Sequence, residues 1–162
     1  MPILFHSDLP GNWRVVLALP AAGLVTHGDE ERALFLKHCP VPAEEAAQAA
    51  RLALLKVLPA IMEGDLEDFG AGLEAMQRFG LKRIQLARQN AEVHATMNEM
   101  RRLGLRGVGM SSWGPTLFGF SDAGPEADQK IVRTLETFGE SVGGVHIILT
   151  SAAAHGATWS WE

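Results

Sequence analysis

The sequence predicts an α+β domain of the ferredoxin-like type, in which helices pack on an antiparallel sheet and the first crossover is enlarged by extra helices. The predicted elements follow the order strand, helices, strand, strand, helix, strand. Helices that alternate with hairpin-linked strands on one sheet are typical of a split βαβ arrangement. The length of 162 residues fits a single domain of this kind.

The first strand is predicted at residues 13–19, a largely apolar and β-branched run that Pro20 closes. A short helical turn is expected at 29–37. The Ala- and Leu-rich stretch 43–62 predicts a helix, and Pro59 should bend or end its last turn because proline lacks a backbone donor.

Two capped helices are predicted next. Asp65 is the expected N-cap of the first, which Gly80 should end, and Asn90 is the expected N-cap of the second, which Gly104 should end. Their apolar faces carry Leu66, Phe69, Leu73 and Met76 in the first helix and Val93, Met97 and Met100 in the second.

The C-terminal third predicts two short strands at 106–110 and 116–120. Asp122 and Pro125 should open a helix that carries Ile131, Leu135 and Phe138. A last strand is predicted at 145–150, and the Ala- and Gly-rich tail 151–162 could add an edge to the sheet.

Composition excludes several classes of protein. The net charge of −5 argues against a protein that binds nucleic acid or anionic membranes through a basic face. Cys39 is the single cysteine, which excludes a disulfide framework and a zinc site of paired CxxC motifs. The sequence predicts no membrane-spanning helix and no secretory signal, so the cytoplasm is the expected location.

The most unusual segment is 107–116, which reads Gly-Val-Gly-Met-Ser-Ser-Trp-Gly-Pro-Thr. Its glycines and proline fix a loop between two strands, and its hydroxyls and backbone N–H groups could converge on one anion. The alternative is a plain hairpin turn whose serines bond to the local backbone. No Walker or GxGxxG pattern is present, and no Gly-x-Ser-x-Gly motif marks either serine as a nucleophile.

Half of all Lys and Arg residues lie within 78–106, directly before this loop. They are Arg78, Lys82, Arg83, Arg88, Arg101, Arg102 and Arg106. A phosphorylated ligand could lie between this basic run and the loop, with Arg106 as the strongest candidate because it starts the strand that leads to the loop. The alternative for most of these side chains is a solvated helix face.

Other polar groups favour structural roles. The turn His27 to Glu31 could offer carboxylates to Mg²⁺, but it also fits the acidic first turn of a helix. The six histidines lack metal-ligand spacing. His146 is expected to pack inside a strand, and Cys39 is expected to be structural.

The run Ser-Ser-Trp-Gly-Pro-Thr at 111–116, within segment 107–116, closely resembles the C-terminal signature loop of beta-ribofuranosylaminobenzene 5'-phosphate synthases. These enzymes belong to the GHMP kinase superfamily and act in tetrahydromethanopterin biosynthesis. Similar stretches occur at 13–20, 28–35 and 58–70, and Gln77 and Gln85 stand where similar glutamines are expected, so the resemblance covers nearly the whole chain.

The resemblance implies a GHMP C-terminal domain at 13–162, a linker at 1–12, and no N-terminal GHMP domain within this chain. It also implies an enzyme that condenses phosphoribosyl pyrophosphate with 4-aminobenzoate or 4-hydroxybenzoate, releases CO₂ and pyrophosphate, and requires Mg²⁺ but no ATP. Expected partners are an N-terminal GHMP half, in cis or in trans, and further copies in a homo-oligomer. The phosphate-binding candidates are Arg106, Gly109, Ser111, Ser112, Gly114 and Thr116.

Two other functions stay open at this point. The chain could be part of a GHMP small-molecule kinase that uses ATP, although Trp113 and Pro115 fill space that a kinase loop leaves open. It could also be a non-catalytic module that binds a ligand or partner through an exposed face.

Overall fold

The computed structural model describes residues 3, 5–153, 156 and 158–160. Its four strands form one antiparallel sheet in the order β2-β3-β1-β4, which confirms the predicted ferredoxin-like class. The strands are β1 (Arg14–Pro20), β2 (Arg106–Met110), β3 (Leu117–Ser121) and β4 (Val145–Thr150). Each lies within one residue of its predicted bounds.

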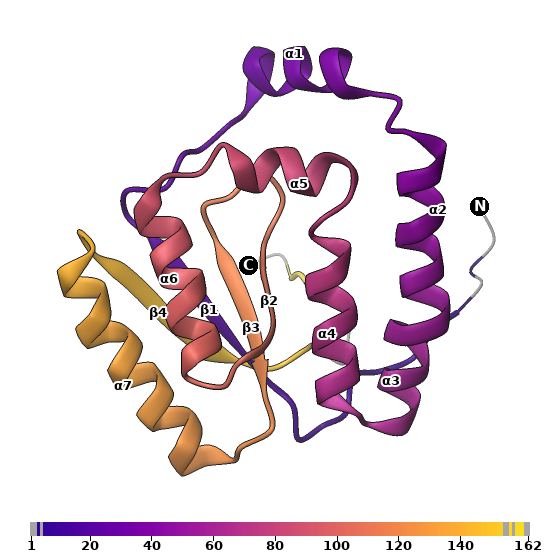
Figure 1. The fold of residues 1–162 in the computed structure, drawn as a ribbon. Helices are drawn as coiled ribbons and strands as arrows, with labels where there is room; N and C mark the ends of the chain where they lie inside the picture. Colours follow the sequence, from indigo (N-terminus) through magenta and orange to yellow (C-terminus); the bar gives the residue numbers. More distant parts are fainter. Residues whose placement is uncertain (1–2, 4, 154–155, 157, 161–162) are drawn as a thin grey trace.

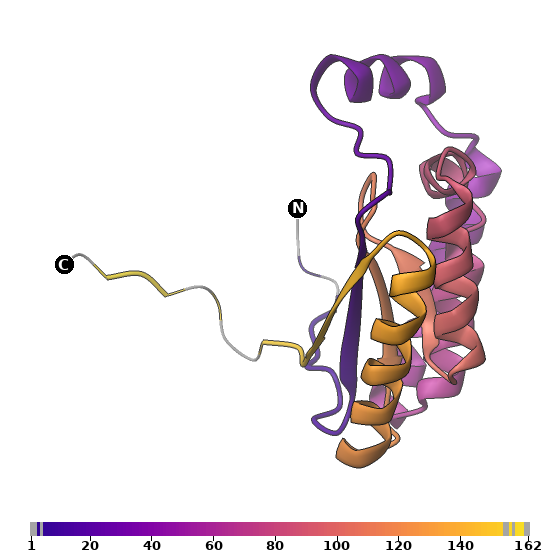
Figure 2. The ribbon, with the colours of Figure 1, turned by 90° about the vertical axis from the view of Figure 1, so that its left-hand side faces the viewer.

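The helices lie on one side of the sheet, as Figures 1 and 2 show together. They are α1 (Gly28–His38), α2 (Ala43–Leu52), the π-helical η1 (Ala53–Val57), α3 (Leu58–Glu63), α4 (Leu66–Met76), α5 (Gly80–Ala87), α6 (Ala91–Arg102) and α7 (Pro125–Ser141). α1 stands apart at one end of the molecule and buries none of its residues (Figure 2). None of the helices in the described part of the chain is long and apolar enough to cross a membrane.

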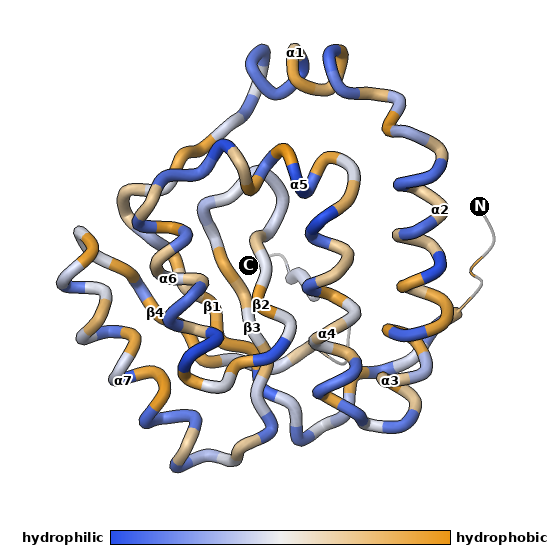
Figure 3. The backbone as a smooth tube through the Cα atoms, in the orientation of Figure 1, coloured by the Kyte–Doolittle hydropathy of each residue, from blue (hydrophilic) through white to orange (hydrophobic). Residues whose placement is uncertain are grey.

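The core consists of two clusters that share the sheet. In the first, Val16 and Ala18 of β1 are fully buried against Met97 and Met100 of α6 and Leu135 of α7. The second joins Trp13, directly before β1, and Phe120 of β3 to the helices η1, α3 and α4. Phe69 of α4 lies 4.9 Å from the ring of Trp13 and 5.0 Å from that of Phe120. Figure 3 shows hydrophobic and hydrophilic residues alternating along α4 and α6, which is the pattern of helices with one buried face.

Both predicted side-chain caps are confirmed. Asp65 accepts a hydrogen bond from the Asp68 backbone N–H at 2.9 Å, and Asn90 accepts one from the Val93 N–H at 3.1 Å. These bonds satisfy donors that the first turn of a helix leaves without a partner.

The cap on α4 leads to a testable prediction. Asp65→Ala should lower the free energy of unfolding by about 1 kcal/mol, because the Asp68 N–H loses its acceptor and the helix dipole loses a negative charge. Glu63→Ala is the matched control, since Glu63 is exposed and caps no helix, and it should change stability by less than about 0.5 kcal/mol. Urea denaturation of both variants measures the difference, and equal values would contradict the capping role.

Four sequence predictions need correction. Gly80 does not end α4, which stops at Met76. It is instead the first residue of α5, a helix that the sequence did not predict. Pro59 does not end the helical run, which continues through α3 to Glu63, and the π-helical turn η1 lies directly before it. Gly124 rather than Asp122 precedes α7. The tail adds no strand in the part of 151–160 that is described, and its residues 154, 155, 157, 161 and 162, like residues 1, 2 and 4 of the predicted linker, lie outside the described residues.

Candidate functional site

The loop between β2 and β3 presents several unused hydrogen-bonding groups. We call residues 111–116 the serine loop. Its turn is closed by two backbone bonds of 2.8 Å, from Ser111 N–H to the Thr116 carbonyl and from Gly114 N–H to the Ser111 carbonyl. Among the described residues, no partner binds the hydroxyls of Ser111, Ser112 and Thr116 or the N–H groups of Ser112 and Trp113. The loop therefore holds five donors without a protein partner in the described part of the chain.

Ser112 adopts a conformation that side chains rarely take. Its φ is +40°, in the left-handed region. Such strain persists where surrounding contacts fix the backbone, and it is common at ligand sites. Here the contact is direct, because the carbonyl of Ser112 accepts a hydrogen bond from Lys82.

Lys82 of α5 binds the backbone at the start of the serine loop, at the end of β2 and within the turn. Its Nζ donates to the carbonyl of Met110 at 2.8 Å and to that of Ser112 at 2.7 Å. Burial lowers the pKa of Lys82 from its ordinary 10.5 to about 8, because desolvation disfavours the charged form. No carboxylate among the described residues forms an ion pair with it. A positive charge without a counter-ion thus stands at the base of the loop.

Three glutamines complete the surroundings. Gln77 accepts a hydrogen bond from the Met110 N–H at 3.3 Å, and Gln89 donates to the Trp113 carbonyl at 3.2 Å. Gln89 also exchanges two bonds of 3.0 Å with the backbone of Leu24, which ties the segment after β1 to the loop. Gln85 lies on α5 one turn after Lys82, is only 6% exposed, and has an Oε1 atom with no partner among the described residues.

α1 contacts the site from outside. The ring of Phe35 meets that of the buried Trp113 edge-on at 5.8 Å, and Glu30 pairs with Arg88 at 2.5 Å. The acidic turn 27–31 is the first turn of this helix, as the structural alternative predicted.

The structure does not bring Arg106 to the serine loop. Arg106 starts β2, the loop follows the end of the same strand, and the two are separated by roughly 13 Å of extended chain. Its Nε bonds to Glu67 at 2.6 Å. Gly109 lies inside β2, where an added Cβ would meet Phe118 and Gln77 rather than open space. Ser111, Ser112, Gly114 and Thr116 are brought together by the turn.

Most of the basic run forms ion pairs, as the solvated-face alternative predicted. The pairs are Arg83 with Glu45, Arg88 with Glu30, Arg101 with Glu74, Arg102 with Glu99, and Arg106 with Glu67. Lys82 is the member of the run that reaches the loop. One other prediction is wrong, since His146 is exposed on β4 rather than packed. Cys39, for which the sequence predicted a structural role, is a free and exposed cysteine.

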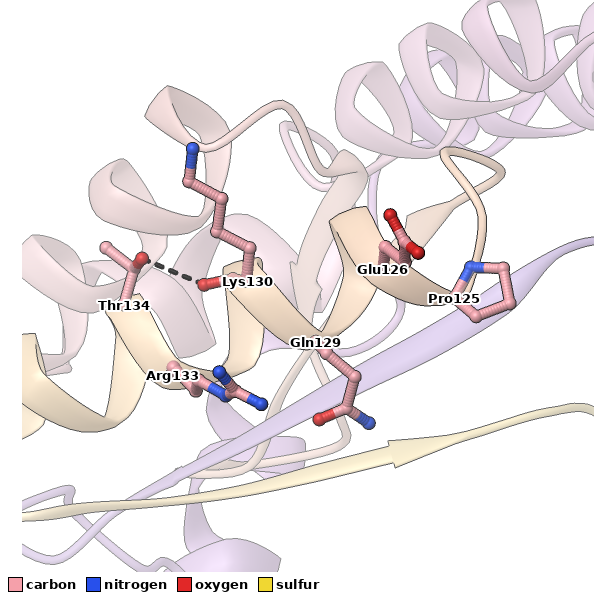
Figure 4. Close-up of a pocket in the computed structure, with 6 residues that line it drawn as sticks. All are labelled: Pro125, Glu126, Gln129, Lys130, Arg133 and Thr134. Atoms are coloured by element: carbon pink, nitrogen blue, oxygen red, sulfur yellow. Dashed lines mark hydrogen bonds between the residues drawn. The ribbon is translucent and has the colours of Figure 1, made fainter.

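A hollow of about 500 Å³ along α7 does not form a second candidate site. It is lined by Pro125, Glu126, Gln129, Lys130, Arg133 and Thr134. Figure 4 shows Glu126 and Lys130 pointing to one side of the helix and Gln129 and Arg133 to the other, so these groups do not converge on one ligand.

Comparison with known proteins gives a family and a set of relatives. The family model "GHMP kinases C terminal" matches residues 57–141. Three curated proteins named beta-ribofuranosylphenol 5'-phosphate synthase are similar to the chain. The one from Methanothermobacter thermautotrophicus is 30% identical over 156 residues, the one from Methanocaldococcus jannaschii 36% over 121, and the one from Archaeoglobus fulgidus 33% over 156.

The matched regions cover most of this chain but less than half of each relative. They span 96%, 75% and 96% of this chain and 46%, 35% and 47% of the relatives, in the same order. Among solved structures, homoserine kinase from Cytophaga hutchinsonii has a TM-score of 0.68 at 15% identity, over 89% of this chain and 43% of that one. A putative homoserine kinase from Listeria monocytogenes has 0.54 at 17%, over 89% and 42%. At 15% and 17% identity, the likeness of these two kinases to the chain shows a shared fold alone.

Proposed function

The chain belongs to the GHMP kinase family through its C-terminal domain, and on that premise we propose that it is the donor-binding half of a beta-ribofuranosylbenzene-type 5'-phosphate synthase. The reaction would join phosphoribosyl pyrophosphate to 4-hydroxybenzoate or 4-aminobenzoate and release CO₂ and pyrophosphate, in the pathway to tetrahydromethanopterin. Because the chain spans about half the length of the curated relatives, catalysis would need an N-terminal GHMP half in cis or in trans.

The observation that carries the proposal is the serine loop above Lys82. Three hydroxyls and two N–H groups of the loop have no partner among the described residues, and an ammonium group without a counter-ion lies at its base. When the bond between the ribosyl carbon and pyrophosphate breaks, negative charge develops on the leaving group. Fixed donors and a partly desolvated cation stabilise such charge without needing a protein nucleophile.

The Mg²⁺ expected from the resemblance has no ready set of protein ligands in this chain. No group of three or more His, Cys, Asp or Glu side chains among the described residues could hold a metal ion. Mg²⁺ commonly binds through substrate phosphates and one or two carboxylates, so in our proposal it would accompany the donor.

Titration of the chain with phosphoribosyl pyrophosphate and Mg²⁺ tests the proposal. We expect the melting temperature to rise with the donor and calorimetry to detect binding, because a ligand present at 100 times its dissociation constant stabilises the folded state by about 2.7 kcal/mol. Mg²⁺-ATP runs in parallel. A response to ATP alone would favour a kinase, and no response to either would contradict the donor site in this half.

Substitutions locate the binding within the chain. Thr116→Val removes one free hydroxyl without changing the shape of the side chain, and it should weaken donor binding about tenfold or more, the value of a hydrogen bond to a charged group. Arg106→Ala is the matched control, since Arg106 lies at the far end of β2 and should leave donor affinity within about twofold. Loss of affinity in the control alone would move the site away from the serine loop.

A further inference from the structure

The two edges of the sheet differ in what meets their backbone groups. The strand order β2-β3-β1-β4 makes β2 one edge and β4 the other. At the β2 edge, the N–H and C=O groups of Val108 and Met110 point away from β3, and each of them bonds to a side chain. The partners are Glu74, Gln77, Lys82 and Arg101. These side chains close the β2 edge to a further strand.

The bonds between β1 and β4 show which groups of β4 point outward. The Ala21 N–H bonds to the Gly144 carbonyl at 2.9 Å. Along an antiparallel ladder, such bonded pairs alternate with pairs whose N–H and C=O groups point away from the partner strand. The even-numbered residues of β4 therefore bond to β1, and the odd-numbered residues present their backbone groups outward. The outward residues are Val145, Ile147 and Leu149.

The outer edge of β4 is open at Ile147 and Leu149. α7 comes close to Val145, since a Cβ on Gly139 would lie 3.1 Å from the Val145 backbone nitrogen. No group among the described residues bonds to the outward N–H and C=O groups of Ile147 and Leu149. Figure 2 looks onto this side of the sheet and shows β4 in front of β1. Two backbone donors and two acceptors are thus available to another strand.

The sequence of β4 lacks the residues that usually protect an edge strand. Exposed edges commonly carry charged residues or proline, because these prevent pairing with another chain. The strand Val-His-Ile-Ile-Leu-Thr contains no Lys, Arg, Asp, Glu or Pro. Ile148 is 38% exposed on the sheet face that the even-numbered residues share. β4 therefore combines an open backbone edge with an uncharged and mostly apolar sequence.

A second copy of this chain fits the open edge. Two identical strands that pair antiparallel are self-complementary about a two-fold axis. With Ile148 on the axis, Ile147 bonds to Leu149 of the second copy and Leu149 to its Ile147, which uses all the open groups. With Ile147 on the axis, Leu149 would have to pair with Val145, which α7 approaches too closely. The geometry therefore favours the axis at Ile148.

We propose that two copies of this chain associate through β4, so that their two four-stranded sheets join into one continuous antiparallel sheet with Ile148 on the two-fold axis. The serine loop follows β2 at the opposite edge of the sheet, so the inference stands apart from donor binding. An interface made by one pair of strands is small, and we expect a monomer–dimer equilibrium that depends on protein concentration.

Charged substitutions of Ile148 test both the surface and its register. Sedimentation of the unmodified chain from micromolar to millimolar concentration should show the dimer. Ile148→Lys and Ile148→Asp should each remain monomeric over the same range, because two like charges face each other on the axis. Mixed in equal amounts, the two variants should dimerise again, since Lys then faces Asp. Ala47→Lys adds a charge on an exposed position of α2 and should leave the equilibrium unchanged.

Leu149→Pro tests the backbone pairing without a charge. Proline removes an N–H that points outward, so the bonds between β1 and β4 are retained and the dimer is lost. Circular dichroism checks that each variant is folded. A chain that stays monomeric at millimolar concentration, or a Leu149→Pro variant that dimerises like the unmodified chain, would overturn the proposal. Failure of the mixed Ile148 variants to dimerise would overturn the axis at Ile148. Donor titration of Ile148→Lys is a separate readout and should match that of the unmodified chain.

Discussion

Gly114→Ala is expected to abolish binding of phosphoribosyl pyrophosphate and to lower the free energy of unfolding by about 2–4 kcal/mol. Gly114 has a φ of +80°, and a Cβ there would lie 2.6 Å from Met110 Sδ and 2.7 Å from Gln89 Nε2. Backbone strain accounts for about 1 kcal/mol, and the forced movement of buried side chains accounts for the rest.

The loss of binding follows from what Gln89 holds together. Its amide group bonds to Trp113 in the serine loop and to Leu24 after β1, and both bonds are displaced if the side chain moves. Gly104→Ala is the matched control. Gly104 has a φ of +91° with open space around its Cβ position, so this variant should lose only about 1 kcal/mol and bind the donor normally. Equal losses of stability and affinity in both variants would show that strain alone matters and that the packing of the loop does not.

Local signals in the sequence predicted the elements whose cause is also local. Asp65 and Asn90 cap their helices through bonds to N–H groups three residues away, which a sequence pattern can contain. The runs that became β1 and β4 are apolar because the sheet buries one of their faces, and their order along the chain was enough to predict the topology.

Features that depend on contacts between residues far apart in the chain could not be predicted from the sequence. Gly80 was expected to end a helix, but its N–H finds an acceptor in Glu45, 35 residues earlier, and α5 begins there. The role of Lys82 depends on carbonyls 28 and 30 residues later in the chain. His146 lies on the exposed face of β4, and a short strand pattern does not tell which face a given residue occupies.

The composition of segment 107–116 was enough to predict the serine loop as a candidate site. The residues that bind the backbone of the loop, Lys82 and Gln89, were not predicted. Arg106 was favoured because it lies on the strand that leads to the loop, and adjacency in sequence suggested adjacency in space. An extended strand instead separates its two ends, whereas α5 brings Lys82 back to the loop and the turn after α5 brings Gln89 there. The basic residue that reaches the site is therefore Lys82, which α5 places beside the loop.

The close approach of α4 to β2 positions one side of this site. Gly70 of α4 lies against the backbone of β2 at Arg106 and Gly107, where the strand carries a bulge. The contact between α4 and β2 runs from Gly70 to Gln77, the residue that follows α4. Gln77 accepts the hydrogen bond from the Met110 N–H next to the serine loop. The distance between helix and strand is thus set by the missing side chain at residue 70.

Gly70→Ala should consequently destabilise the domain by about 2–4 kcal/mol, even though alanine is the better helix former by about 1 kcal/mol. The added Cβ would lie 2.7 Å from both Arg106 Cβ and the backbone nitrogen of Gly107, and a backbone atom in a sheet cannot move aside cheaply. Gly72→Ala is the comparison on the same helix. Its Cβ would meet a side-chain methyl group, Val57 Cγ2, also at 2.7 Å, and a rotation of that side chain can relieve the contact. We therefore expect urea denaturation to show a clearly larger loss for Gly70→Ala, and the NMR signal of the Met110 amide to shift only in that variant. If Gly70→Ala were as stable as the unmodified chain, the spacing between α4 and β2 would not depend on this glycine, and Gln77 would need another explanation for its place at the loop.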